Sequence, residues 1–196
     1  MKIAFVQAHD RHHGFTLIEL LVVVAIAAIL LAVATPSLRG IIISNRVQSA
    51  SSEFQSALAM ARSEAVKRGG DARVTIVANQ KTGNAPNWAS GVTVFYDTTS
   101  NANNNAPPTD ASTLLMRTSA FPDGVVVNIS FPHLIYNGLG RTISSNGAFL
   151  AGTAAFGAAD TTWHCNIISM SGRTRSARVT NAVYTAPAPA GGCQAN

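Results

Sequence analysis

An uninterrupted apolar segment near the N-terminus constrains this 196-residue chain more than any other feature. Fifteen consecutive apolar residues run from Leu20 to Ala34, and no residue from Leu20 to Leu38 is charged. With three apolar residues that precede it, the segment reaches about 20 residues, the length of helix that crosses the ~30 Å apolar core of a bilayer. The sequence therefore predicts a transmembrane or filament-core helix over residues 15–36.

One carboxylate, Glu19, lies inside this apolar segment. A charged side chain in a bilayer costs about 2.5–3.5 kcal/mol, so its presence needs a physical reason. One alternative is a stray charge that is tolerated near the helix end by snorkelling. The hydrophilic residues 1–14 before the segment also leave two general alternatives open: a secretory signal peptide cleaved after Ala32-Val33-Ala34, and a plain signal-anchor helix.

The string GFTLIE at residues 14–19, followed by the apolar run and Pro36, resembles the class III signal of type IV prepilins and type II secretion pseudopilins. The resemblance implies a leader of residues 1–14, cleavage by a prepilin peptidase between Gly14 and Phe15, and methylation of the new Phe15 amine. It also implies that Glu19 is an assembly residue, which meets the N-terminal amine of a neighbouring subunit. Two charges that are costly alone in lipid cost less as a pair.

Beyond Pro36 the apolar residues keep a helical period, at steps of three and four. Lys67 and Arg68 in the last turn, followed by Gly69, are typical of a helix end. One helix is therefore expected from about residue 15 to 68, and its part at 37–68 belongs to a globular domain over residues 37–196. The apolar stripe consists of Val47, Ala50, Phe54, Leu58, Ala61 and Ala65.

From residue 72 to 196 the pattern changes to alternation, which predicts strands separated by turns. Strands are expected at 73–78, 92–96, 114–118, 125–131, 163–170 and 173–184, with shorter ones near 134–136, 141–143 and 148–150. The predicted architecture is α+β, with a long N-terminal pilin-type helix packed against antiparallel β-sheets.

The string ARSEAVKRG at residues 61–69 resembles the helix-to-strand segment of the FimT/GspH family of type IV minor pilins and type II secretion pseudopilins, and is closest to FimT-type minor pilins. The resemblance implies a chain that crosses the inner membrane once before assembly, with a periplasmic globular domain, and then enters an extracellular pilus. Its implied partners are other pilins in a filament, the inner membrane and prepilin peptidase.

No arrangement of residues typical of an enzyme occurs in the sequence. There is no His-x-x-x-His spacing for zinc, no phosphate-binding loop and no nucleophile elbow. We therefore expect no catalytic residue, no metal and no cofactor. The prepilin signal places Cys165 and Cys193 on the oxidising side of the membrane, so a disulfide between them is expected, with two free thiols as the alternative.

A cluster of arginines follows a predicted turn in the C-terminal region. The net charge of +5 is mild, so its distribution is more informative than its size. Gly172 in the turn precedes Arg173 and Arg175, which the alternation of a strand places on one face, whereas Arg178 falls on the other. Unpaired arginines at a hairpin tip can donate two hydrogen bonds to a phosphate. They can also simply keep a sheet edge soluble.

The Gly-Arg-x-Arg pattern resembles the DNA-contacting motif of FimT-type minor pilins, which serve DNA uptake in natural transformation. The resemblance implies that Gly172, Arg173 and Arg175 contact double-stranded DNA without sequence specificity. Arg178 would assist, as would Arg141 of the separate Gly-Arg turn if the two hairpins abut. Two alternatives stay open: a GspH-like pseudopilin of a type II secretion system, and a structural pilus-assembly subunit, neither with a nucleic acid ligand.

Overall fold

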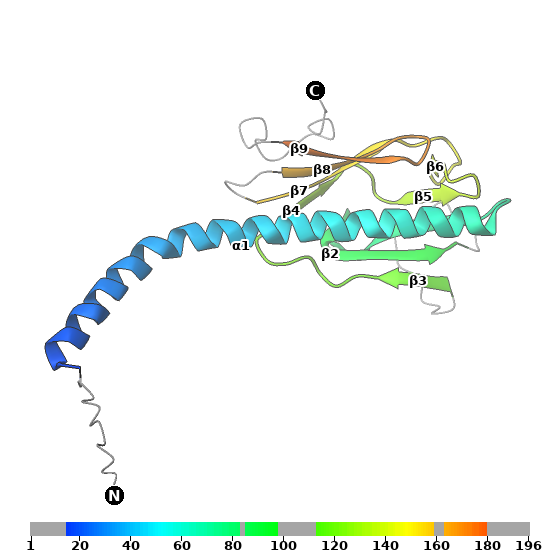
Figure 1. Cartoon of the computed structure of the whole chain (residues 1–196). Coiled ribbons are helices and arrows are strands. Elements are labelled where there is room, and N and C mark those ends of the chain that lie inside the picture. The colour runs from blue at the N-terminus through cyan, green and yellow to red at the C-terminus, as the bar shows by residue number, and fades with distance from the viewer. Residues whose placement is uncertain (1–14, 83–84, 98–112, 159–162, 180–196) are drawn as a thin grey trace, which may run out of the picture. The chain divides into compact units, whose positions relative to one another are not determined.

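The computed structural model describes residues 15–82, 85–97, 113–158 and 163–179, and within them one helix, α1 (Leu17–Arg68), precedes two antiparallel sheets (Figure 1). This confirms the predicted α+β architecture. The chain divides into two compact units, Met1–Arg39 and Gly40–Asn196, which are described separately. The strands are β1 (Arg73–Thr82), β2 (Ala85–Tyr96), β3 (Leu114–Arg117), β4 (Val126–Ile129), β5 (Leu134–Asn137), β6 (Thr142–Ile143), β7 (Gly152–Gly157), β8 (Trp163–Ile168) and β9 (Thr174–Val179).

The N-terminal unit begins α1 with a capping box, which the sequence analysis did not identify. The amide of Glu19 donates to Oγ1 of Thr16 at 3.3 Å, and the amide of Thr16 donates to Oε2 of Glu19 at 3.4 Å. Phe15 is exposed, and Gly14 lies outside the described residues. Among the residues that the structure describes, no helix has a stretch both long enough and apolar enough to span a membrane.

The second half of α1 is the central element of the globular unit. All six residues of the predicted apolar stripe are at most 1% exposed, which confirms the stripe. The ring of Phe54 lies 6.3 Å from that of Trp88 in β2 and 5.4 Å from that of Phe156 in β7. Because β2 and β7 belong to different sheets, the helix joins both sheets in one core (Figure 1).

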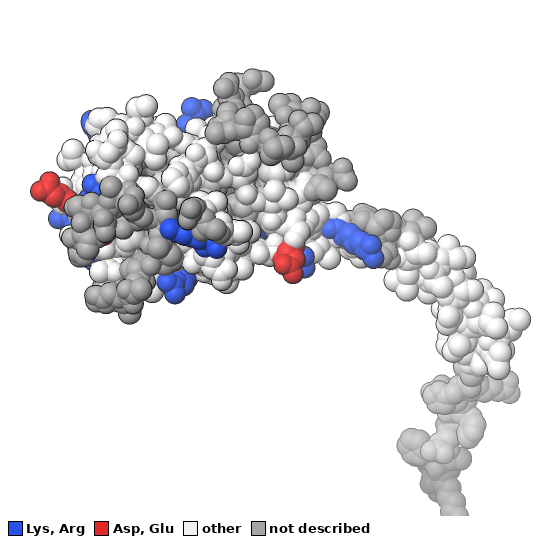
Figure 2. All heavy atoms as spheres, turned by 180° about the vertical axis from the view of Figure 1, so that it is seen from behind, with Lys and Arg blue, Asp and Glu red and all other residues white. Residues whose placement is uncertain are grey.

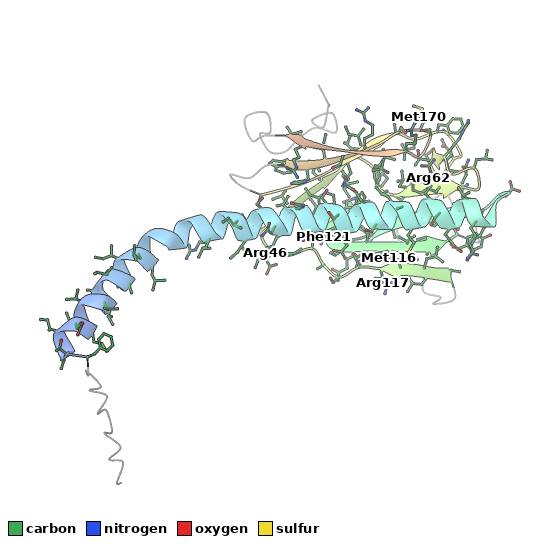
Figure 3. All side chains as sticks on the ribbon, viewed as in Figure 1. Arg46, Arg62, Met116, Arg117, Phe121 and Met170 are labelled. Atoms are coloured by element: carbon green, nitrogen blue, oxygen red, sulfur yellow. The ribbon has the colours of Figure 1, made fainter. Side chains whose placement is uncertain are left out.

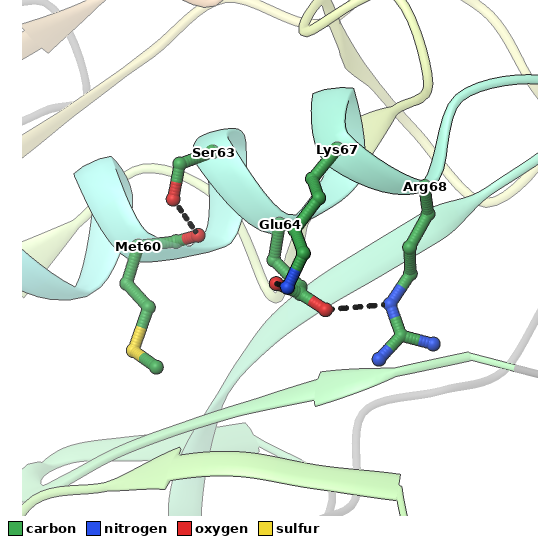
Figure 4. A network of polar contacts seen from close by, with 5 residues as sticks. All are labelled: Met60, Ser63, Glu64, Lys67 and Arg68. Atoms are coloured by element: carbon green, nitrogen blue, oxygen red, sulfur yellow. Dashed lines mark hydrogen bonds and ion pairs between the residues drawn. The ribbon is translucent and has the colours of Figure 1, made fainter.

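The C-terminal end of α1 is fixed by a charged network (Figure 4). Nε of Arg68 donates to Oε1 of Glu64 at 2.7 Å, and Nζ of Lys67 lies 3.8 Å from the other carboxylate oxygen. The hydrogen bond from Arg68 is the main cause that lowers the pKa of Glu64. The Arg68 guanidinium also lies 4.3 Å from the centre of the Tyr96 ring in β2. Gly69, with a φ of 63°, ends the helix as the sequence predicted.

The strands form a five-stranded sheet in the order β3-β2-β1-β5-β6 and a four-stranded sheet in the order β4-β7-β8-β9. The expected strand at 148–150 is instead one isolated bridge between Ile143 and Phe149. The expected strand at 173–184 begins at Thr174 and is described as far as Val179; residues 180–184 lie outside the described residues.

Strand β7 occupies a segment, Gly152–Gly157, where the sequence analysis expected none. Its two terminal glycines leave room for aromatic rings. A Cβ on Gly157 would lie 2.1 Å from Cδ2 of Trp163, and a Cβ on Gly152 would lie 2.4 Å from Cδ1 of Phe131. The strand is therefore determined by packing and not by β-branched residues.

Candidate nucleic-acid interface

The hairpin formed by β8 and β9 carries the predicted arginines. The amide of Gly172 donates to the carbonyl of Ser169 at 2.8 Å, and the amide of Ser169 donates to the carbonyl of Arg173 at 3.0 Å. Gly172 has a φ of 75°, a conformation that disfavours side chains with a Cβ. The predicted turn is therefore present, and Arg173 leads directly from it into β9.

The pairing of β8 with β9 decides where each arginine lies. Arg175 is opposite Ile167, and Arg178 is opposite the buried His164. Since cross-strand partners share a face, Arg175 and Arg178 lie on opposite faces of the sheet. Arg173, two positions before Arg175, shares its face, as the alternation predicted. The structure therefore groups Arg173 with Arg175 and separates Arg178 from them.

The face of Arg178 is the one that packs on α1. The neighbouring position of β8 on that face, Asn166, accepts a hydrogen bond from Nε2 of Gln55 at 2.6 Å and donates to Oγ of Ser51 at 3.1 Å. Burial lowers the pKa of His164, and the charge of Arg178 lowers it further. Arg173 and Arg175 therefore lie on the outer face of the sheet.

The arginines of the hairpin are exposed and have no acidic neighbour in the described part of the chain. The ion pairs found there involve Arg73, Lys67 and Arg68 and none of the hairpin residues. On the face of the molecule shown in Figure 2, Lys and Arg side chains are spread more widely than Asp and Glu side chains. The guanidinium groups of Arg173 and Arg175 therefore keep their hydrogen-bond donors available for an anion.

The second Gly-Arg turn packs directly against the hairpin turn. A Cβ on Gly172 would lie 1.9 Å from the carbonyl oxygen of Gly140. Thr142 links the two turns, because its amide donates to the carbonyl of Met170 at 3.3 Å. Its hydroxyl lies within hydrogen-bond distance of two carbonyls, that of Leu150 at 2.6 Å and that of Ser169 at 2.9 Å. The two hairpins therefore abut, which is the condition under which the sequence analysis included Arg141.

Arg141 is exposed beside the hairpin turn. Its guanidinium lies 5.3 Å from the centre of the Phe149 ring, which also is exposed. Arg141 and Phe149 line a small hollow of about 130 Å³ together with Met170 and Ser171 of the hairpin. We call Arg141, Arg173 and Arg175 the arginine rim.

A third element, α1, reaches the same turns through Arg62, a residue to which the sequence analysis gave no role. Nη2 of Arg62 donates to the carbonyl of Ser171 at 3.3 Å. Its Nε lies 3.2 Å from the position of a Cβ on Gly140. Figure 3 shows Arg62 between α1 and the sheet whose hairpin carries Met170. The only signal in the sequence was its place in the ARSEAVKRG string.

A groove of about 730 Å³ lies between α1 and β9, and Tyr136 is at its floor. Tyr136 is fully buried, and its hydroxyl has no hydrogen-bond partner among the described residues. Burial raises the pKa of Tyr136 to about 12, against smaller opposite effects of Thr174 and Arg62. Thr174 is thus close to the phenol but does not satisfy it, and an unsatisfied buried hydroxyl costs about 1–3 kcal/mol. The groove is lined by Gln55, Leu58, Ala59, Arg62, Ser63, Val66, Lys67, Tyr136, Gly172, Thr174 and Ser176.

Two further predicted features concern metals and cysteines. No group of three or more His, Cys, Asp or Glu side chains comes together as a metal site within the residues described. Cys165 is fully buried in β8, on the sheet face that it shares with Trp163 and Ala155. Cys193 lies outside the described residues, so the bond between the two cysteines stays a prediction.

A long N-terminal helix that packs its second half against two antiparallel sheets defines a pilin-like protein. The chain belongs to the GspH family: residues 50–180 match the family described as Type II transport protein GspH. Residues 9–35 match the prokaryotic N-terminal methylation motif. The predicted family is therefore confirmed, and the chain is of the type IV minor pilin or pseudopilin class, whose families are structural and not enzymatic.

The fold is similar to that of the type IV minor pilin FimU of Pseudomonas aeruginosa PAO1, solved in two crystal forms. The first is 21% identical with a TM-score of 0.50, and the match covers 67% of this chain and 87% of that one. The second is 21% identical with a TM-score of 0.49 and covers 66% and 91%. No curated protein matches the sequence.

The family and the N-terminal motif agree with the predicted localisation, at the inner membrane with a periplasmic globular domain before assembly and in a pilus afterwards. They agree equally with other pilins and prepilin peptidase as partners.

Proposed function

We propose that this chain is a type IV minor pilin that binds double-stranded DNA for uptake in natural transformation, through the arginine rim. The observation that carries the proposal is the position of Arg173 and Arg175: both are exposed on one outer face, directly after a tight turn, without a carboxylate partner among the described residues. Arg141 on the abutting turn supplies a third cation.

The geometry of an extended strand suits contacts to the phosphate backbone. Side chains two positions apart on a strand are about 6–7 Å apart, which is similar to the spacing of consecutive phosphates along one nucleic acid strand. Guanidinium groups donate two hydrogen bonds to one phosphate, and such contacts carry no sequence information. Binding by so few cations is therefore expected to be modest, independent of sequence and strongly dependent on salt.

Arg178 is not expected to contact the DNA directly, although the sequence pattern suggested that it would assist. It lies on the face of β9 that is opposite to Arg175. A duplex that lies on the outer face can be reached by Arg173 and Arg175, with Arg141 on the abutting turn, while Arg178 adds long-range attraction only.

The proposal includes the processing of the N-terminus. Cleavage between Gly14 and Phe15 would leave a free Phe15 amine for methylation, and Glu19 would pair with that amine in a neighbouring subunit. The match of residues 9–35 to the methylation motif supports this part. In the isolated chain Glu19 caps the helix with Thr16, so it is already at the end of the helix that the amine would approach.

A second candidate is a pseudopilin of a type II secretion system. The family description, Type II transport protein GspH, favours it. In that case the arginine rim is a solvated or subunit-contacting surface, and the chain has no nucleic acid ligand.

DNA binding by the unit Gly40–Asn196, which contains every residue of the buried core, tests the proposal. Fluorescence anisotropy with a labelled random duplex of 30 base pairs should show binding whose affinity falls about 40-fold between 50 and 200 mM salt, as three phosphate contacts predict. Arg173→Ala/Arg175→Ala should weaken binding at least tenfold and reduce the magnitude of the logarithmic salt slope by about 2.

The matched control is Lys81→Ala/Arg117→Ala, which removes the same charge from exposed positions on β1 and β3. Its affinity should stay within threefold of the unsubstituted protein. DNA binding that survives the loss of Arg173 and Arg175, or that does not respond to salt, would exclude the arginine rim as the site.

A further inference from the structure

The groove between α1 and β9 has a feature that DNA binding does not use, the edge of a sheet. Within the described residues β9 is the last strand of the four-stranded sheet. The amide of Ser169 donates to the carbonyl of Arg173, so these two residues form a hydrogen-bonded pair of the hairpin. Along an antiparallel ladder, hydrogen-bonded and non-hydrogen-bonded pairs alternate. The main-chain N–H and C=O of Arg175 therefore point toward β8, whereas those of Thr174 and Ser176 point outward.

The side chains of the same two residues line the groove. Thr174 and Ser176 are exposed, and they lie on the face of β9 that packs toward α1. The outward amides and carbonyls of β9 and the opening of the groove are therefore next to each other. An edge strand beside a groove, as β9 is among the described residues, is the arrangement in which proteins bind an extended peptide as an additional strand.

The floor of the groove contains a polar group that has no hydrogen-bond partner in the described part of the chain. Tyr136 is fully buried, and the two residues whose effects reach its hydroxyl, Thr174 and Arg62, both line the groove. The hydroxyl therefore lies near Thr174 and Arg62, and no described residue is placed at a distance and angle that satisfy it. A carbonyl of an incoming segment would satisfy it.

The charges around the groove indicate what kind of ligand it can bind. Arg62 and Lys67 line its helix side, where Lys67 is also 3.8 Å from Glu64, and Arg178 lies on the same face of β9 as Ser176. No carboxylate lines the groove among the described residues. Apolar side chains of α1, among them Leu58 and Val66, form much of the remaining wall. Cations around an apolar wall fit a peptide with carboxylates and aliphatic side chains better than a nucleic acid.

We propose that this groove and the edge of β9 bind an extended acidic segment of a neighbouring pilin subunit, which adds a fifth strand beside β9. Membership in a family of filament subunits makes another pilin the partner. A second β9 does not fit this place, because it would bring Arg173, Arg175 and Arg178 against their own copies. The proposal does not rest on DNA binding.

NMR titration of the ¹⁵N-labelled unit Gly40–Asn196 tests the proposal with two synthetic peptides, TVEVEVT and its lysine counterpart TVKVKVT. The acidic peptide should shift the amide signals of Thr174, Ser176 and Arg178, whose N–H groups point outward. The lysine peptide should bind at least tenfold more weakly, because the groove is rimmed by cations. No shift, or equal shifts with both peptides, would overturn the proposal.

Two variants separate binding at this groove from a structural effect. Tyr136→Phe removes an unsatisfied hydroxyl, so the protein should remain folded while the acidic peptide binds at least threefold more weakly. Ser176→Pro removes an outward amide without touching the bonds to β8, and it should abolish strand addition. DNA affinity should be unchanged in both. Unchanged peptide binding in both variants would exclude this site, and loss of DNA affinity would assign the groove to nucleic acid.

Discussion

At the scale of single residues, His133 makes the stability of the globular unit depend on pH. Its side chain is only 7% exposed. Burial is the main cause that lowers its pKa from 6.5, the charge of Arg73 lowers it further, and Asp97 opposes both. Since the pKa is lower in the folded than in the unfolded state, the unfolded chain binds the proton more readily. The stabilising contribution is complete above about pH 6.5 and is lost as the pH falls through the folded pKa.

We therefore predict that thermal unfolding of the unit Gly40–Asn196 occurs at lower temperature at pH 5.5 than at pH 7.5. His133→Gln should reduce this difference, because a glutamine does not take up a proton. Some pH dependence should remain, since burial also lowers the pKa of His164. Melting curves of both proteins at the two pH values provide the measurement. A melting temperature that rises on acidification would contradict the sign of the effect.

At the scale of elements, one helix residue connects α1 to the two glycine turns. Arg62 donates to the carbonyl of Ser171 and lies against Gly140, which in turn contacts Gly172. We predict that Arg62→Gln destabilises the protein by about 1 kcal/mol, the value of one hydrogen bond, and loosens the hairpin turn. Hydrogen exchange of the Gly172 amide, which bonds to Ser169, should accelerate several-fold.

A substitution on the exposed side of the same helix is the control for Arg62. Met60 is 40% exposed and lies on α1 two positions earlier. Met60→Gln should leave the exchange of the Gly172 amide unchanged. Equal acceleration in both variants would mean that the helix as a whole, and not the guanidinium of Arg62, holds the turns.

Elements with a strong local pattern were predictable from the sequence, and those held by packing were not. The stripe of α1 has a helical period, and the hairpin at Gly172 has a turn signal followed by alternation, so both were predicted correctly. Strand β7 consists of glycines, alanines, one phenylalanine and a single β-branched residue, Thr153, so no β-branched pattern marks it. Its glycines are explained only by Trp163 and Phe131, which pack over them in space.

At the scale of the whole molecule, the candidate site combines segments that are far apart in the chain. Arg62 and Ser171 are separated by 109 positions, yet they are hydrogen-bonded. The sequence predicted each Gly-Arg turn and the faces of Arg173 and Arg175, because these follow from local alternation. It did not predict that the two turns abut, or that Tyr136 lies under a groove, since both depend on how the two sheets pack on α1.

A disulfide between Cys165 and Cys193 is also predicted, and it would affect the stability of the whole molecule. Cys165 is fully buried on the face of its sheet that is turned away from α1, beside Trp163. Closing a loop of about 28 residues should stabilise the folded state by about 3–4 kcal/mol. Cys193→Ser should therefore lower the melting temperature by roughly 10 °C, at about 2–4 °C per kcal/mol. Dithiothreitol should lower it equally in the unsubstituted protein and have no effect in the variant. A reductant effect that persists in Cys193→Ser would show that the loop is not closed by this bond.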